Sequence, residues 1–257
     1  MAATPAAEGA GGRAGRTRRV VRPAQAPPDK FGVVLVLLCV GYLVYALTAA
    51  PWAHWVVPAV YLAALSFAVR TSRPGPRVRR LVRVLLAVSA VVVAGALALL
   101  PRDAAIGVLD AVLIVLLGTT LAIILGRVLS GRDVTLSAIA GALSAYLVIG
   151  LLFANVFGVL AWVMPEPFFA GGQEADQQSL QYFSFTTLTT VGYGDYTAAS
   201  YPGRGVATFE ALVAQVFLAT LVARLVASFR RPGAPPEQGP GVAPGPATAP
   251  GPPGTSA

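Results

Sequence analysis

The sequence predicts an all-α membrane protein with six transmembrane helices and a re-entrant helix and loop between the fifth and the sixth. Charged residues make up 12% of the chain, against about 25% in a soluble domain. Hydrophobic residues make up 56% and gather into runs near 20 residues long, enough to cross a hydrocarbon core of roughly 30 Å. Between the last two runs lies a stretch that is too short and too polar to cross.

Each apolar run defines one expected span, and the runs cover residues 31–50, 52–69, 81–100, 104–125, 134–164 and 205–229. The stretches 1–29 and 232–257 are rich in Ala, Pro and Gly without periodicity, which predicts disordered tails. Residues 30–130 therefore form a four-helix region, and residues 131–231 form a second domain around the polar stretch.

Arginine placement predicts the orientation, because short basic loops stay in the cytoplasm. Arginines cluster before the first span, between the second and third, after the fourth and after the sixth; the opposite loops hold only Arg102 and Arg204. We therefore expect a multi-pass protein of the cell membrane with both termini in the cytoplasm.

The four-helix region lacks a recognisable voltage sensor. Such sensors carry arginines at every third position of a helix that lies in the membrane field, whereas residues 104–125 hold no basic residue and one acid, Asp110. Arg77, Arg80 and Arg83 have that spacing but stop before the apolar centre of the third span, so we interpret them as positive-inside anchors.

The polar stretch, residues 177–195, reads QQSLQYFSFTTLTTVGYGD. Its first part, 178–189, predicts a helix, and a glycine-bearing run follows. Non-helical backbone at membrane depth is tolerated only where protein buries it or it lines a watery path, so this pattern predicts a re-entrant loop.

The glycine-bearing run has the chemistry of a potassium filter. A dehydrated K⁺ needs several oxygens in place of its water shell, and stacked rings of backbone carbonyls from four chains supply them. Alternate residues must then adopt conformations that a Cβ disfavours, which Gly192 and Gly194 permit. The predicted ion-binding residues are Thr190, Val191, Gly192, Tyr193 and Gly194, with K⁺ held at the first four.

Residues 182–195, YFSFTTLTTVGYGD, closely resemble the pore loop of the potassium channel superfamily, whose filters carry the TVGYG signature. Residues 139–152 and 207–226 look like the outer and inner pore helices of the small bacterial two-helix-pore ion channel family. This resemblance covers roughly residues 134–230, and it implies a channel pore preceded by four additional helices.

The chain departs from the pattern of many such relatives at four positions. Two tryptophans and an acid of the pore helix are replaced by Tyr182, Phe183 and Thr186, so the brace behind the filter is expected to join Asp195 to Tyr182 or Thr186. Ala214 stands where the inner helix usually bends at a glycine, and alanine favours a continuous helix.

The last span contributes further candidates. Gln215, Leu218 and Val222 recur at helical spacing and are expected to line a cavity below the filter, or, for Gln215, to hydrogen-bond a neighbouring helix. Glu210 is an acid within a span and hence a functional candidate, expected to bond the back of the pore helix as a filter support.

These patterns predict a homotetrameric subunit that passes K⁺ passively across the lipid bilayer, with no cofactor beyond the permeant ion and no nucleic-acid partner. No Ser/His/Asp triad, carboxylate pair or metal-ligand constellation indicates an enzyme. Two alternatives stay open, namely a weakly selective cation channel and an electrically silent regulatory subunit.

Overall fold

A computed structural model describes residues 31–48, 53–72, 75–130 and 135–229. The two expected tails lie outside these residues. The described part is helical apart from its connections and one isolated antiparallel bridge, which confirms the all-helical class. Its helices are α1 (Phe31–Leu47), α2 (Ala53–Ser72), α3 (Pro76–Leu99), α4 (Arg102–Ser130), α5 (Leu136–Val163), α6 (Gln177–Leu188) and α7 (Tyr201–Phe229).

Each predicted span contains a helix, but several predicted ends are wrong. α3 begins at Pro76 rather than 81, because proline suits the first turn of a helix, where its missing N–H is not needed. α7 begins at Tyr201 rather than 205, because the Ser200 hydroxyl accepts a hydrogen bond from the Gly203 N–H (3.2 Å) and caps the first turn. α4 also runs past 125 to Ser130.

Among the described residues, four helices are long and apolar enough to cross a membrane: α3, α4, α5 and α7. The described apolar parts of α1 and α2 are shorter, at Phe31–Val44 and Ala59–Thr71. The chain is thus a multi-pass membrane protein by length and composition, and the count of six spans stays a prediction.

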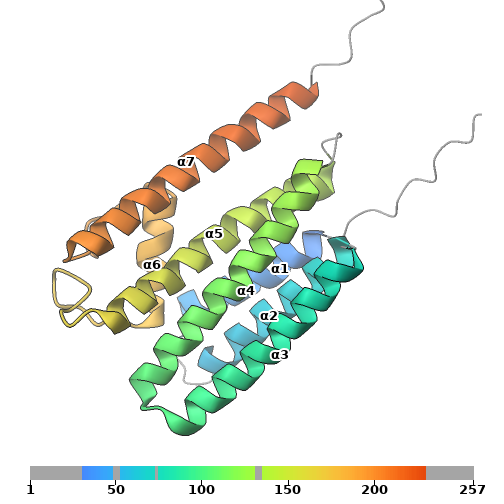
Figure 1. The fold of residues 1–257 in the computed structure, drawn as a ribbon. Helices are drawn as coiled ribbons and strands as arrows, with labels where there is room; N and C mark the ends of the chain where they lie inside the picture. The colour runs from blue at the N-terminus through green and yellow to red at the C-terminus, as the bar shows by residue number, and fades with distance from the viewer. Residues whose placement is uncertain (1–30, 49–52, 73–74, 131–134, 230–257) are drawn as a thin grey trace, which may run out of the picture.

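The long helices run side by side in alternating directions, with α5 between α4 and α7 (Figure 1). α5 also packs against α1, where Phe31, Val34 and Leu38 join a buried cluster with Ala145 and Val148. The short helix α6 lies crosswise between α5 and α7. The four-helix region is therefore in direct contact with α5, the helix against which α6 packs.

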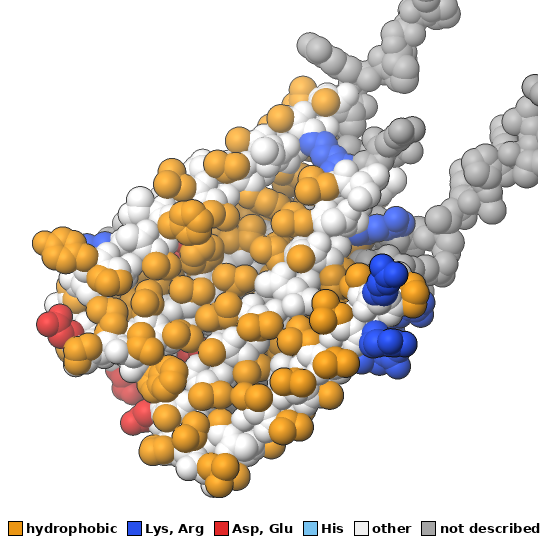
Figure 2. Space-filling model, viewed as in Figure 1, with side chains coloured by type: hydrophobic (Ala, Val, Ile, Leu, Met, Phe, Trp, Pro, Cys, Tyr) orange, Lys and Arg blue, Asp and Glu red, His pale blue; other side chains and the backbone are white. Residues whose placement is uncertain are grey.

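Charged side chains gather at opposite ends of the bundle (Figure 2). The basic end is formed by the last turns of α2 and α4, the last two turns of α7 and the first two turns of α3, with Arg70, Arg77, Arg79, Arg80, Arg83, Arg127 and Arg224. The acidic end holds Asp103, Glu166, Glu174, Asp176 and Asp195, together with Arg102 and Arg204. The connections on either side of α6 lie at the acidic end.

Candidate ion-conduction site

Helix α6 is fixed at both ends. Its N-cap, Asp176, accepts a hydrogen bond from the Ser179 N–H (2.7 Å), which satisfies one free donor of the first turn. At the other end, the Tyr146 hydroxyl of α5 donates to the carbonyl of Leu188 (3.0 Å). The start of the following loop is thus held in place against α5.

Residues 190–194, called the TVGYG segment below, have an alternating backbone. The φ angles of Thr190, Gly192 and Gly194 are +58°, +52° and +82°, whereas Val191 and Tyr193 keep negative φ. Alternation of this kind turns successive carbonyl groups toward one side of the strand. Glycine adopts positive φ freely, but Thr190 carries a Cβ, and the sequence analysis did not anticipate its left-handed conformation.

The first three amide groups of the TVGYG segment turn back toward α6. The N–H groups of Val191 and Gly192 both donate to the carbonyl of Thr186 (2.9 and 3.2 Å), and the Thr190 N–H donates to the carbonyl of Thr187 (3.0 Å). Among the described residues, no backbone N–H outside the helices donates a hydrogen bond to the carbonyl oxygens of residues 190–194. The segment therefore presents a row of free oxygens, the ligand type that a dehydrated K⁺ requires.

Asp195 is held by three contacts directly after the segment. Its carboxylate accepts hydrogen bonds from the Tyr182 hydroxyl (2.8 Å) and the Tyr196 N–H (3.1 Å), and its carbonyl accepts one from the Gln173 side chain (2.8 Å). The Tyr182 hydroxyl therefore restrains the residue that directly follows the TVGYG segment.

Of the two expected partners of Asp195, the structure thus pairs it with Tyr182. The Thr186 hydroxyl instead donates to the carbonyl of Phe183 within α6 (3.0 Å). Thr186 supports the TVGYG segment through its own carbonyl, as described above.

Glu210 joins α7 to the back of α6. Its side chain is fully buried, and one carboxyl oxygen lies 2.5 Å from the Ser184 hydroxyl of α6. That hydroxyl also lies 2.7 Å from the Gly150 carbonyl of α5. The other carboxyl oxygen has no hydrogen-bond partner among the described residues. One serine therefore connects the three helices of the site.

Aromatic rings fill the space between α5, α6 and the connecting loops. The Phe183 ring packs against Phe157, Phe168 and Phe169, with ring centroids 5.0–5.9 Å apart. Phe169 also pairs with Ala198 in the antiparallel bridge. Phe183, one of the departures from the family pattern, is thus a packing residue, whereas Tyr182 contributes a hydrogen bond as well.

The candidate cavity residues lie further along α7. The helix continues without interruption through Ala214, which is buried. Gln215 and Val222 are exposed and Leu218 is half-buried in the single chain. The structure thus leaves this face of α7 largely uncovered by the chain's own helices.

Several residues of the site escaped the sequence analysis. Tyr146, Gln173 and Ser184 contact the loop or its helix. Tyr146 and Ser184 lie in the stretches that resemble the outer pore helix and the pore loop, but the resemblance assigned no role to either. Ser184 and Tyr146 carry one weak signal, a polar group within a largely apolar stretch. Their partners are far away in the sequence, so spacing alone does not predict the contacts.

Residues 145–231 match the family model described as "Ion channel". The matched part includes most of α5, all of α6 and the TVGYG segment, and α7. This part of the chain is thus similar to ion-channel domains, and the likeness points to a channel protein rather than an enzyme. Comparisons with curated proteins and with solved structures found no match.

Proposed function

We propose that the chain is one subunit of a homotetrameric, potassium-selective channel whose filter is the TVGYG segment. The observation that carries this proposal is the row of free carbonyl oxygens on a backbone of alternating φ. One chain supplies one side of an ion cage, so four chains around an axis are needed to surround a dehydrated K⁺. The ion-channel family match of the same residues supports the class.

The neighbouring residues have supporting roles in this proposal. The Thr190 hydroxyl adds a ring of oxygens at the inner mouth, and Asp195 attracts cations at the outer mouth while Tyr182 holds it in place. Glu210 keeps α6 against α7. Gln215, Leu218 and Val222 line the cavity below the filter.

We infer the topology from the separation of charge. The basic end lies in the cytoplasm by the positive-inside rule, which places both termini there and gives six spans. α6 and the TVGYG segment then enter the membrane from the acidic end and return to it. Nearby Glu166, Glu174 and Asp176 give that end a negative field that concentrates cations.

Flux into liposomes that contain the purified full chain tests the proposal. We expect K⁺ to enter and Na⁺ to be excluded, and we expect the Gly192→Ala variant to lose K⁺ flux. Equal K⁺ and Na⁺ flux would indicate a weakly selective cation channel instead. No flux from folded tetramers, together with altered current when the chain is co-expressed with another channel subunit, would indicate a silent regulatory subunit.

A further inference from the structure

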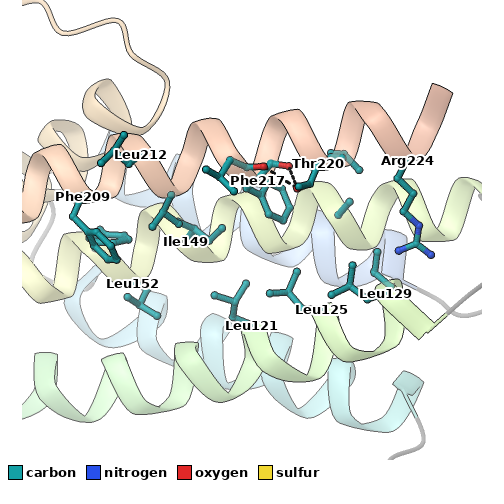
Figure 3. Close-up of a pocket in the computed structure, with 16 residues that line it drawn as sticks. Leu121, Leu125, Leu129, Ile149, Leu152, Phe209, Leu212, Phe217, Thr220 and Arg224 are labelled. Carbon is teal, nitrogen blue, oxygen red and sulfur yellow. Dashed lines mark hydrogen bonds between the residues drawn. The ribbon is translucent and has the colours of Figure 1, made fainter. Parts of the chain in front are cut away.

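A groove separates the second half of α7 from α4 and α5 (Figure 3). Its volume is about 520 Å³, within the range of roughly 300–1,000 Å³ typical of small-molecule sites. Side chains of all three helices point into it, among them Leu121, Leu125, Ile149, Leu212 and Phe217. Apart from Thr220 and Arg224, every residue of the lining is apolar.

The groove is longer than one leaflet of a bilayer. Its lining on α7 extends from Phe209 to Arg224, which corresponds to about 22 Å of helix at 1.5 Å per residue. Half of a hydrocarbon core is about 15 Å. Measured from Arg224 at the basic end, the groove therefore passes the depth of the membrane centre, so it is long enough for one acyl chain of a phospholipid.

Positive charge surrounds the end of the groove. Arg224 extends from α7 into the gap beside Leu129 of α4. The nearby parts of α4, α5 and α7 (residues 121–130, 135–142 and 220–229) contain Arg224 at the groove, Arg127 on the exposed side of α4 and no acid. The connection between α4 and α5, which lies outside the described residues, adds Arg132 and Asp133. An anionic headgroup therefore suits this end, because each arginine near a membrane surface favours anionic lipid by about fivefold.

We propose that an anionic phospholipid of the bilayer binds here, with an acyl chain in the groove and its phosphate at Arg224. The groove side of α7 excludes Gln215, Leu218 and Val222, so it does not coincide with the proposed cavity face. Lipid binding at this groove does not depend on whether the channel selects K⁺. A lipid bound there separates α7 from α4 and sets the spacing between the four-helix region and the last helix.

Native mass spectrometry of the detergent-purified full chain tests the charge preference. The probes are phosphatidylglycerol and phosphatidylcholine that carry the same palmitoyl and oleoyl chains. We expect phosphatidylglycerol to bind about fivefold more tightly and Arg224→Gln to abolish this preference. Arg127→Gln is the matched control, since it removes the same charge from an exposed residue outside the groove and is expected to retain the preference.

A second measurement locates the acyl chain. Phosphatidylglycerol with a photoactivatable acyl chain is expected to label residues 121–129 of α4 and 212–221 of α7 in the unmodified protein. Thr220→Trp, which fills the groove, is expected to abolish that labelling.

Three results would overturn the proposal. If Arg224→Gln and Arg127→Gln reduced the preference for phosphatidylglycerol equally, the lipid would be attracted by the basic surface as a whole rather than bound at Arg224. Labelling confined to other faces, such as α3, would place the lipid elsewhere. Labelling that persists at full strength in Thr220→Trp would mean that the acyl chain does not enter the groove.

Discussion

Gly192 is the residue whose conformation the candidate filter depends on most. A Cβ at this position meets no atom within 4 Å, so space does not prevent substitution, but the φ of +52° does. A left-handed conformation costs a residue with a side chain about 1–2 kcal/mol, and in the proposed tetramer four chains incur that cost.

We therefore expect Gly192→Ala to abolish or strongly reduce K⁺ flux while leaving the helices folded. Gly205→Ala is the matched control, since Gly205 lies in α7 with no atom near its Cβ position. There alanine is expected to favour the helix by about 0.5–1 kcal/mol and to preserve flux. Liposome flux and circular dichroism of both variants provide the measurement, and full K⁺ flux through Gly192→Ala would contradict the assigned role.

Tyr182 and Thr186 have different roles at Asp195. The Tyr182 hydroxyl donates to the Asp195 carboxylate, whereas the Thr186 hydroxyl bonds within its own helix. We expect Tyr182→Phe to shorten channel openings several-fold because the outer end of the TVGYG segment loses a restraint. Thr186→Val preserves the carbonyl that accepts from the segment and is expected to change openings little. Single-channel recording compares the two, and the reverse order of effects would contradict the geometry.

At the scale of helices, the Ser184 hydroxyl links α5, α6 and α7. Glu210→Ala removes one of the two hydrogen-bond partners of this buried hydroxyl. The loss of a buried hydrogen-bond partner lowers the free energy of unfolding by about 1–3 kcal/mol. Glu210→Gln keeps a polar group within reach and is expected to cost less. Thermal unfolding of the purified full chain, in a double-mutant cycle with Ser184→Ala, measures the coupling between the residues. Additive effects of Glu210→Ala and Ser184→Ala would show that this contact carries no energy.

Glycines allow α4 and α5 to approach closely. A Cβ at Gly158 of α5 would meet the carboxylate of Asp110 on α4, and one at Gly107 of α4 would meet the Trp162 ring of α5. Small residues serve this purpose at helix contacts in membranes. The buried Asp110 is thus accommodated against α5, a contact that its position in the sequence did not predict.

We expect Gly158→Ala to destabilise the protein by about 1–3 kcal/mol, as overpacking does. Gly126→Ala is the control on α4, because its Cβ position is open, and it is expected to be neutral or stabilising. Chemical denaturation in detergent compares the two variants. Equal stability of both would mean that α4 and α5 separate easily.

At the scale of the whole chain, the sequence predicted helices better than contacts between them. Long apolar runs define α3, α4, α5 and α7 because the bilayer sets their length, and the spacing of Gly192 and Gly194 predicted two of the three positive φ angles in the TVGYG segment. The ends of α3 and α7 depend on local capping at Pro76 and Ser200 and were placed too late. The contacts of Gln173 and Ser184 arise only once distant segments meet.

The proposed tetramer predicts a dominant effect of one defective chain. If wild type and Gly192→Ala are produced in equal amounts and mix freely, roughly one sixteenth of tetramers contain four intact filters. Flux per protein is then expected to fall far below half of the wild-type value. A fall to half would indicate that each chain conducts by itself.

The central claim is that the TVGYG segments of four chains select K⁺ over Na⁺. The most direct measurement is the reversal potential of the purified full chain in a planar bilayer, with K⁺ on one side and Na⁺ on the other. We predict a large reversal potential of the sign set by K⁺ permeation. A reversal potential near zero would contradict the claim, because the pore would then pass both ions alike.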